Sequence, residues 1–450
     1  MAKGEPACAA RLDREPAQGI VVVVIDALRA DHLSCYGFQR PTPNIDAMAG
    51  KGVVFEKAYA NGSWTKPAIA SLFTGLWPSE TGTTALTAKA VDGTYRETGI
   101  PGGIETLAEA LGKKGYQCAG FVSNPNLSAE VGFARGFAVY DERQGRCKEL
   151  AARCARWFTS LPEGRRFFAY LHFLEPHAPY AVADPLPGKM DGTAATPSII
   201  VPAGVRSYQD FAEWRDAVNL GKRSVSREEL EVILSTYDAK IRECDTAIGD
   251  LVRALQDAGV FENALVIITA DHGENFLEHG TIEHPAWGLY EEQLSIPLVV
   301  KFPVSWGVGH RRVKGTAQTI DIPATICGAA GEAFGRGVDL AGYAASGRLP
   351  DRMIVCESSS GFMVMGNGTK AQFRNSGDAA NIVGLYDVRK GRPQGDNILE
   401  KWPSYVSRLT KRVARWKEFV AARRPGNAGM TAGAISEKRR EELRAVGYLN

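Results

Sequence analysis

The chain is 450 residues long, with 44% hydrophobic and 23% charged residues and a formal net charge of +2. This composition is typical of a globular protein with its own core, and the near-neutral charge gives no reason to expect nucleic acid or an anionic membrane as a partner. The length favours one large α/β domain with a smaller addition.

The termini and the cysteines indicate the compartment. No apolar run approaches the ~20 residues of a membrane span. Residues 1–19 form a polar tail without the apolar centre of a secretory signal, which predicts a cytoplasmic protein. The eight cysteines are scattered without a short metal-type pair, so we expect reduced thiols.

The first predicted strand covers residues 20–25, which are six aliphatic residues without polar alternation. Such a run is typical of a central parallel strand buried on both faces. It is followed by Asp26, at the carboxyl end of the strand, where open α/β sheets bind their ligands. Alone, Asp26 could equally be a turn residue.

A second region of interest is residues 61–75, a Gly/Asn/Ser loop that leads into a predicted helix. Pro67 lies in the first turn, where the missing N–H costs nothing. Thr65 is therefore expected at a helix N-terminus, where N–H groups and the helix dipole favour an anion.

Helices and strands then alternate, which predicts a parallel or mixed sheet with helices on both faces. Residues 181–226 are irregular and rich in proline, and we interpret them as a substrate lid or insert rather than a disordered segment. A long amphipathic helix follows at 227–258. A second apolar strand at 264–269 again leads to an acid, in Asp271-His272-Gly273-Glu274.

These motifs resemble the sulfatase family, within the alkaline phosphatase superfamily. Its signature has a Cys or Ser nucleophile, then any residue, Pro, Ser or Ala, and Arg. Thr65, Pro67 and Ala68 fit this pattern, and Thr74-Gly75 matches the Thr-Gly pair nine and ten residues after the nucleophile. The resemblance implies an alkaline-phosphatase-like α/β fold with a mixed, mostly parallel sheet, a catalytic domain at 20–330 and a smaller C-terminal subdomain at 331–450.

Two positions depart from the signature: Thr65 replaces the nucleophilic Cys or Ser, and Ile69 replaces the Arg. Because Thr cannot be converted to formylglycine, we expect no such modification. Thr at this position resembles the phosphodiesterase and phosphoethanolamine-transferase branches of the superfamily.

The resemblance also implies a divalent metal ion, which could be Ca, Mn or Zn. The expected ligands are Asp26, Thr65, Asp271 and His272. The chemistry requires such an ion, because a Thr hydroxyl is a poor nucleophile until a metal lowers its pKa.

Five of the seven histidines fall within 172–177 and 272–284. The resemblance implies that His177 and His284 contact the anion and assist proton transfer, and it makes His279 a third candidate for binding substrate. Some of these histidines could instead hold a second metal. We interpret His172, inside a strand, as structural. Lys66 could screen the anion or be a solvated side chain.

The sequence thus predicts a hydrolase of sulfuric or phosphoric esters with a small anionic substrate and Thr65 as nucleophile. The alternatives are a phosphodiester or phosphonate monoester hydrolase, a phospho-group transferase, or a degenerate member that only binds anions. Because Thr65 has a single hydroxyl and Ile69 replaces Arg, we expect faster turnover of a phosphodiester than of an aryl sulfate.

Overall fold

A computed structural model describes residues 14–84, 88–89, 95–180, 208–366, 368–376, 379–388 and 397–424, together with residues 440 and 443. Most of the predicted N-terminal tail and residues 181–207 of the predicted lid lie outside this part of the chain.

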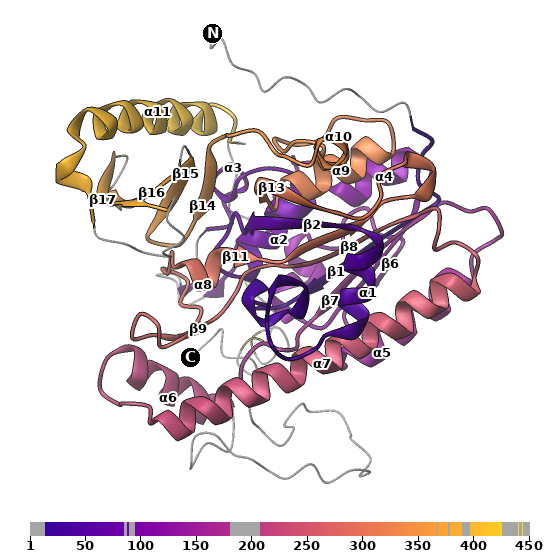
Figure 1. The fold of residues 1–450 in the computed structure, drawn as a ribbon, viewed down its shortest axis with the longest axis horizontal. Helices are drawn as coiled ribbons and strands as arrows, with labels where there is room; N and C mark the ends of the chain where they lie inside the picture. The colour runs from indigo at the N-terminus through magenta and orange to yellow at the C-terminus, as the bar shows by residue number, and fades with distance from the viewer. Residues whose placement is uncertain are drawn as a thin grey trace.

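A nine-stranded mixed sheet forms the centre of the molecule (Figure 1). Its core consists of three parallel strands whose residues are all buried: β1 (Gly19–Ile25), β7 (Phe167–Phe173) and β8 (Ala264–Ala270). β12 (Leu298–Lys301) runs antiparallel to β8. The other strands are β2 (Val53–Tyr59), β5 (Gln117–Val122), β6 (Val139–Asp141), β11 (Ser295–Ile296) and β13 (Arg311–Gln318). The prediction of a mixed, mostly parallel sheet is confirmed.

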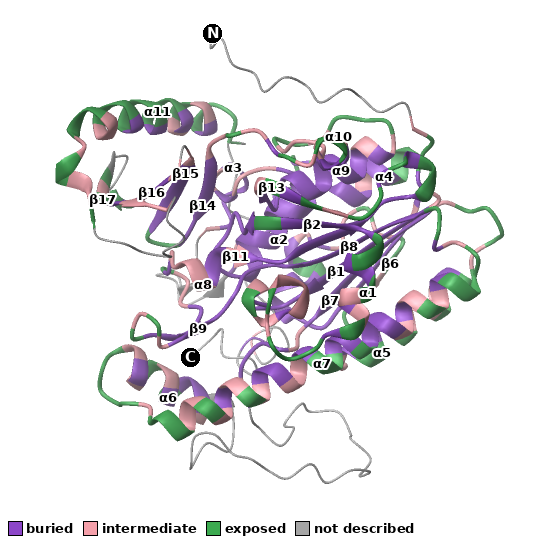
Figure 2. Ribbon diagram, viewed as in Figure 1, coloured by how far each residue is buried: buried purple, intermediate pink, exposed green. Residues whose placement is uncertain are grey.

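Helices cover both faces of this sheet, as predicted (Figure 1). One layer contains α1 (Pro43–Lys51), α5 (Cys147–Thr159) and the long α7 (Arg227–Asp257), which pack on one another. The other layer contains α2 (Thr65–Thr74), α4 (Leu107–Lys113), α9 (Asp321–Ala329) and α10 (Leu340–Ser346). The strands and the inner helix faces are buried, while the outer face of α7 is exposed (Figure 2).

A smaller antiparallel sheet follows, with the strand order β14 (Ile354–Glu357), β15 (Gly361–Gly366), β16 (Thr369–Ser376) and β17 (Ala379–Asp387). The amphipathic helix α11 (Pro403–Ala421) covers it, and Leu409, Val413 and Trp416 pack with Phe362 and Phe373 in a separate core. The predicted C-terminal subdomain is therefore present, whereas the boundaries 20–330 and 331–450 stay predictions.

Short elements complete the described fold. They are α3 (Pro78–Thr81), α6 (Tyr208–Asn219), α8 (Glu291–Leu294), β3 (Ala88–Lys89), β4 (Tyr95–Arg96), β9 (Asn275–Phe276) and β10 (Ile282–Glu283). No described helix is long and apolar enough to cross a membrane. The seven cysteines in the described ranges are free thiols.

Candidate active site

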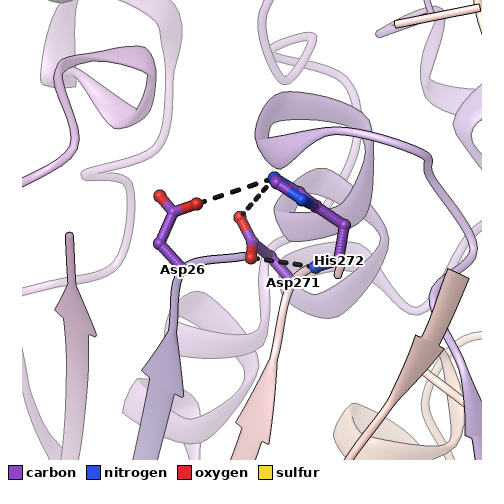
Figure 3. Close-up of side chains that lie close together, drawn as sticks. All are labelled: Asp26, Asp271 and His272. Carbon is purple, nitrogen blue, oxygen red and sulfur yellow. Dashed lines mark hydrogen bonds and ion pairs between the residues drawn. The ribbon is translucent and has the colours of Figure 1, made fainter. Parts of the chain in front are cut away.

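The site begins where β1 and β8 end. The two strands pair in register, with Ile25 opposite Ala270, so the next residues, Asp26 and Asp271, lie side by side. His272 completes the group (Figure 3). Its Nε2 lies 3.6 Å from Asp26 Oδ1 and 3.4 Å from Asp271 Oδ2, and all three side chains are fully buried. One potential ligand atom from each residue lies within 4.8 Å of the others.

The hydrogen bonds of the two carboxylates leave one oxygen of each without a partner. Asp26 Oδ2 accepts from Asn124 and contacts His172 Nε2 at 3.0 Å, and Asp271 Oδ1 accepts from the N–H groups of Ala27 and His272. Asp26 Oδ1 and Asp271 Oδ2 are buried, and neither has a hydrogen-bond partner among the described residues. Because a buried, unpaired carboxylate oxygen is costly, these two atoms with His272 Nε2 fit a divalent cation.

The surroundings favour the charge states that such a cation needs. Burial opposes the ionisation of Asp26, but the nearby histidines, His177 most strongly, hold the pKa of its carboxyl well below its usual range. Burial also lowers the pKa of His272, which favours the neutral imidazole that can act as a metal ligand.

The backbone after Asp26 is held in an unusual conformation. Ala27 has a φ of 57°, in the left-handed region that non-glycine residues rarely adopt. The Tyr237 hydroxyl of α7 donates to Ala27 O at 2.7 Å and accepts from Arg29 N at 2.9 Å. The long helix thereby fixes the turn that carries the first acid.

Thr65 is the first residue of α2, as predicted, and is buried. Its Oγ1 lies 3.3 Å from His272 Nε2 and 3.4 Å from Asn124 Nδ2. The competing hydroxyl, Ser63 Oγ, instead donates to the carbonyl of Ala286 at 3.0 Å. The geometry therefore brings Thr65, rather than Ser63, to the Asp–Asp–His group.

Three histidine rings form a row that starts at this group. The His284 ring lies 4.1 Å from the His272 ring, and the His177 ring lies 4.8 Å from that of His284. His284 Nδ1 contacts Glu274 Oε1 at 2.9 Å, which orients the ring. Burial and the nearby Glu283 raise the pKa of Glu274 to about 8.

The third candidate, His279, has other contacts. Its Nε2 lies 2.9 Å from Glu292, and its ring stacks on Tyr290 at 4.1 Å. His279 has no described contact with the Asp–Asp–His group. Its role in substrate binding stays a prediction.

Two residues contact the site although the sequence did not single them out as functional. His172, interpreted as structural, lies 3.0 Å from Asp26 and 2.8 Å from the Tyr170 hydroxyl. Asn124 donates to Asp26 Oδ2 at 2.6 Å. The available signal was their position: β7 and β5 are parallel to β1, so polar residues at their carboxyl ends meet Asp26.

Lys66 is not a solvated side chain, because it is fully buried and pairs with Glu97 at 2.5 Å. Ile69, at the signature's Arg position, is fully buried in the main hydrophobic core. Arg29 pairs with Asp31 and Glu278. Ile69 therefore supplies no guanidinium to the site, in contrast to the Arg of the sulfatase signature.

The fold and the site together define an enzyme of the alkaline phosphatase superfamily, with its acids at the strand ends and a hydroxyl at a helix N-terminus. The sulfatase family model matches residues 18–332. The chain belongs to the sulfatase family, a family of sulfuric ester hydrolases.

Individual relatives are distant. The Δ4,5-hexuronate-2-O-sulfatase of Bacteroides thetaiotaomicron is 21% identical over 364 residues, which cover 72% of this chain and 70% of that protein. For eight curated relatives that it matches, the chain spans between 50% and 73% of their length.

Two solved structures share the fold. A protein in complex with its substrate D-glucosamine-2-N,6-O-disulfate has a TM-score of 0.70 and 16% identity, with 93% of this chain and 100% of that chain covered. The phosphonate monoester hydrolase of Agrobacterium radiobacter has a TM-score of 0.65 and 20% identity, with 94% and 99% covered.

Proposed function

We propose that this protein is a metal-dependent hydrolase of sulfuric esters in which the Thr65 hydroxyl is the attacking group. The observation that carries the proposal is the convergence of Thr65 Oγ1 with Asp26, Asp271 and His272, where two buried carboxylate oxygens have no protein partner. The substrate class is a sulfated sugar, as the names of the hexuronate sulfatase and the glucosamine-disulfate complex indicate for those proteins.

A divalent cation bound by these residues would lower the pKa of the Thr65 hydroxyl and offset the charge of the transferred group. The N-terminus of α2 would add N–H groups and its dipole toward the same anion. His284, whose ring contacts Glu274, and the neighbouring His177 would protonate the leaving oxygen. Since Thr65 has no second hydroxyl to eliminate, water would then hydrolyse the esterified Thr65, with one of these histidines as base.

A second candidate substrate is a phosphodiester or a phosphonate monoester. It is favoured by the single hydroxyl of Thr65 and by Ile69, which removes a guanidinium that the sulfatase signature provides. The similar fold of a phosphonate monoester hydrolase is consistent with this alternative. If this alternative holds, a chromogenic phosphodiester should be turned over faster than the matching aryl sulfate.

The test is to strip the purified protein with a chelator and to add Mn²⁺, Zn²⁺ or Ca²⁺ separately. Turnover of 4-nitrophenyl sulfate and of bis(4-nitrophenyl) phosphate is then followed for the native protein and for Thr65→Ala. A clear preference for the aryl sulfate with every metal would overturn the phosphodiester expectation. Metal binding without turnover of either ester would instead favour a degenerate member that only binds anions.

Transfer to an acceptor other than water is a separate outcome. It would appear as release of 4-nitrophenol without an equal amount of free sulfate from the aryl sulfate, or of 4-nitrophenyl phosphate from the phosphodiester. Measuring both products in one reaction therefore distinguishes a hydrolase from a transferase.

A further inference from the structure

A cleft of about 610 Å³ lies between the central sheet and the C-terminal sheet. Its lining includes Lys57 of β2, Lys314 of β13 and Arg348, together with Gly366, Gly368 and Thr369. It adjoins the beginning of β14, whereas Glu357, at the end of β14, binds the backbone of the loop that leads to Thr65. The cleft is therefore separate from the Asp–Asp–His group.

Three cations of this cleft have no described acidic partner. Lys57, Lys314 and Arg348 are exposed, and none of their charged groups makes an ion pair in the described part of the chain. By contrast, Arg352 in the same lining is committed to a bidentate pair with Asp321.

The backbone holds these three cations close together. Lys314 and Arg348 form a parallel bridge, and Leu349 N donates to Lys314 O at 2.7 Å. Lys57 lies opposite Thr316 in the pairing of β2 with β13, two residues from Lys314. Neighbouring like charges repel one another, so an anion that enters the cleft gains from all three.

The acids in the lining do not neutralise this charge. Glu291 receives hydrogen bonds from Tyr59 and from the buried Lys370, which lies at 3.5 Å. Asp351 is the other carboxylate of the lining. The lining thus holds two carboxylates, of which Glu291 is engaged by Tyr59 and Lys370, beside three cations without an ion pair in the described part of the chain.

The positive surface continues onto α11. A smaller cleft shares Arg352, Met365 and Thr369 with the first one and extends to Arg412. α11 carries five Lys or Arg and one Glu, a net charge of +4, against +2 for the whole chain. α11 thus adds basic residues next to the cleft.

We propose that this cleft is a secondary binding site for a sulfated oligosaccharide, with its sulfate groups against Lys57, Lys314 and Arg348 and the chain continuing toward Arg412. The volume suits several sugar rings rather than one inorganic anion. The choice of sulfate rests on the proposed function. Binding here would raise the local concentration of a polymeric substrate around Thr65 without any new contact at the reacting ester.

Other polyanions fit less well. An anionic membrane is flat and would need an apolar helix face to insert, but Leu409, Val413 and Trp416 of α11 are buried against the C-terminal sheet. Single-stranded nucleic acid is usually bound through exposed aromatic side chains on which bases stack, and Tyr59 in the cleft is buried with its hydroxyl bound to Glu291.

The experiment measures binding of a fluorescein-labelled heparin octasaccharide to the full chain. We expect the triple variant Lys57→Gln, Lys314→Gln, Arg348→Gln to bind at least about tenfold more weakly, since three charge contacts are lost. A matched triple variant, Lys148→Gln, Arg156→Gln, Lys222→Gln, removes the same charge from exposed positions outside the cleft and should bind like the native protein.

Further arms separate the possible results. Thr65→Ala should bind the octasaccharide normally, and the cleft variant should keep the native rate on a small chromogenic ester. Equal binding by the cleft variant and the native protein would overturn the site. Tighter binding of a single-stranded oligonucleotide of equal charge, through the same three residues, would overturn the assignment of the ligand. If Thr65 is not the nucleophile, this will show only in the turnover of the small ester, and the binding of the octasaccharide will be unaffected.

Discussion

At the scale of single residues, the sequence indicated those members of the site that follow apolar strands directly. Asp26 and Asp271-His272 were expected from the family resemblance together with the apolar strands that they follow, and β1 and β8 do pair in register there. His172 and Asn124 were not predicted as site residues, because their role depends on which strands neighbour β1. That order, with β7 and β8 beside β1 and β5 beyond β7, is a property of the folded sheet.

The role of Thr65 can be tested against the nearby Ser63. Thr65→Ala should lower kcat by at least about a thousandfold, since it removes the attacking hydroxyl. Ser63→Ala should keep most of the activity, because the Ser63 hydroxyl is bound to the Ala286 carbonyl. The measurement is kcat on a chromogenic ester with thermal unfolding as the folding control. Full activity of Thr65→Ala would refute the assignment of the nucleophile.

Asn124 can be tested as a positioning residue for Asp26. Asn124→Ala removes the 2.6 Å hydrogen bond to Asp26 Oδ2 and should weaken metal affinity by about 10- to 100-fold, as is usual for residues that orient metal ligands. The affinity for Mn²⁺ is measured by competition with a chromogenic chelator. Asn126→Ala is the control, because the Asn126 side chain makes no described hydrogen bond to the Asp–Asp–His group. Equal Mn²⁺ affinities in both variants would contradict this role.

At the scale of elements, long apolar or amphipathic runs were predicted well and element ends less well. Capping fixes some of these ends: α4 begins at Leu107, where Thr106 and Glu109 form a capping box. At the start of α1, the backbone N–H of its second residue, Asn44, donates to Asp245 of α7. α6 forms inside 181–226, which looked irregular throughout.

The C-terminal sheet also supports the loop before Thr65, which no local pattern predicted. Ser63 N donates to Glu357 O at 3.0 Å, and Glu357 N donates to Asn61 O at 2.8 Å. The buried Glu357 carboxylate accepts from Ser79 N and Oγ. These contacts join segments almost 300 residues apart along the chain, so they arise only from the tertiary fold.

The burial of Glu357 predicts a pH dependence of stability. Burial raises the pKa of its carboxyl from 4.5 to about 7, although the hydrogen bonds from Ser79 oppose this shift. The folded state therefore binds the proton more tightly than the unfolded state. The protonated Glu357 therefore contributes to the free energy of unfolding. This contribution, as much as about 3 kcal/mol, is fully present below about pH 4.5 and is lost as the pH rises through 7.

The variant that isolates this effect is Glu357→Gln, which has no proton to lose. We expect the fall in the free energy of unfolding between pH 5 and pH 8 to be smaller in this variant than in the native protein. Urea denaturation at several pH values measures it, with the exposed Glu400→Gln as control. The same pH slope in all three proteins would show that Glu357 ionises normally.

At the scale of the whole molecule, the proposed metal site joins distant parts of the fold. Asp26 follows β1, Asp271 follows β8 and Thr65 begins α2, while Tyr237 of α7 fixes the turn after Asp26. A cation held there would bind the folded chain and not the unfolded one, so it would stabilise the whole domain by mass action. Its removal would leave two unpaired carboxylate oxygens facing one another in a buried site.

Metal removal should therefore lower the Tm of the native protein, with about 2.7 kcal/mol lost when the free metal had been at a hundred times its Kd. Asp271→Asn should lose the metal-dependent rise in Tm together with activity, because a neutral amide is the weaker ligand. In chelator, however, this variant should unfold at the same Tm as the native protein or higher, since one of the two facing carboxylates has lost its charge. Scanning fluorimetry with EDTA and with Mn²⁺ gives the Tm of both proteins under both conditions.

If Mn²⁺ raises the Tm of both proteins equally, Asp271 is not a metal ligand. If the variant is less stable even in chelator, the hydrogen bonds that Asp271 Oδ1 accepts from Ala27 and His272 outweigh the repulsion between the two acids.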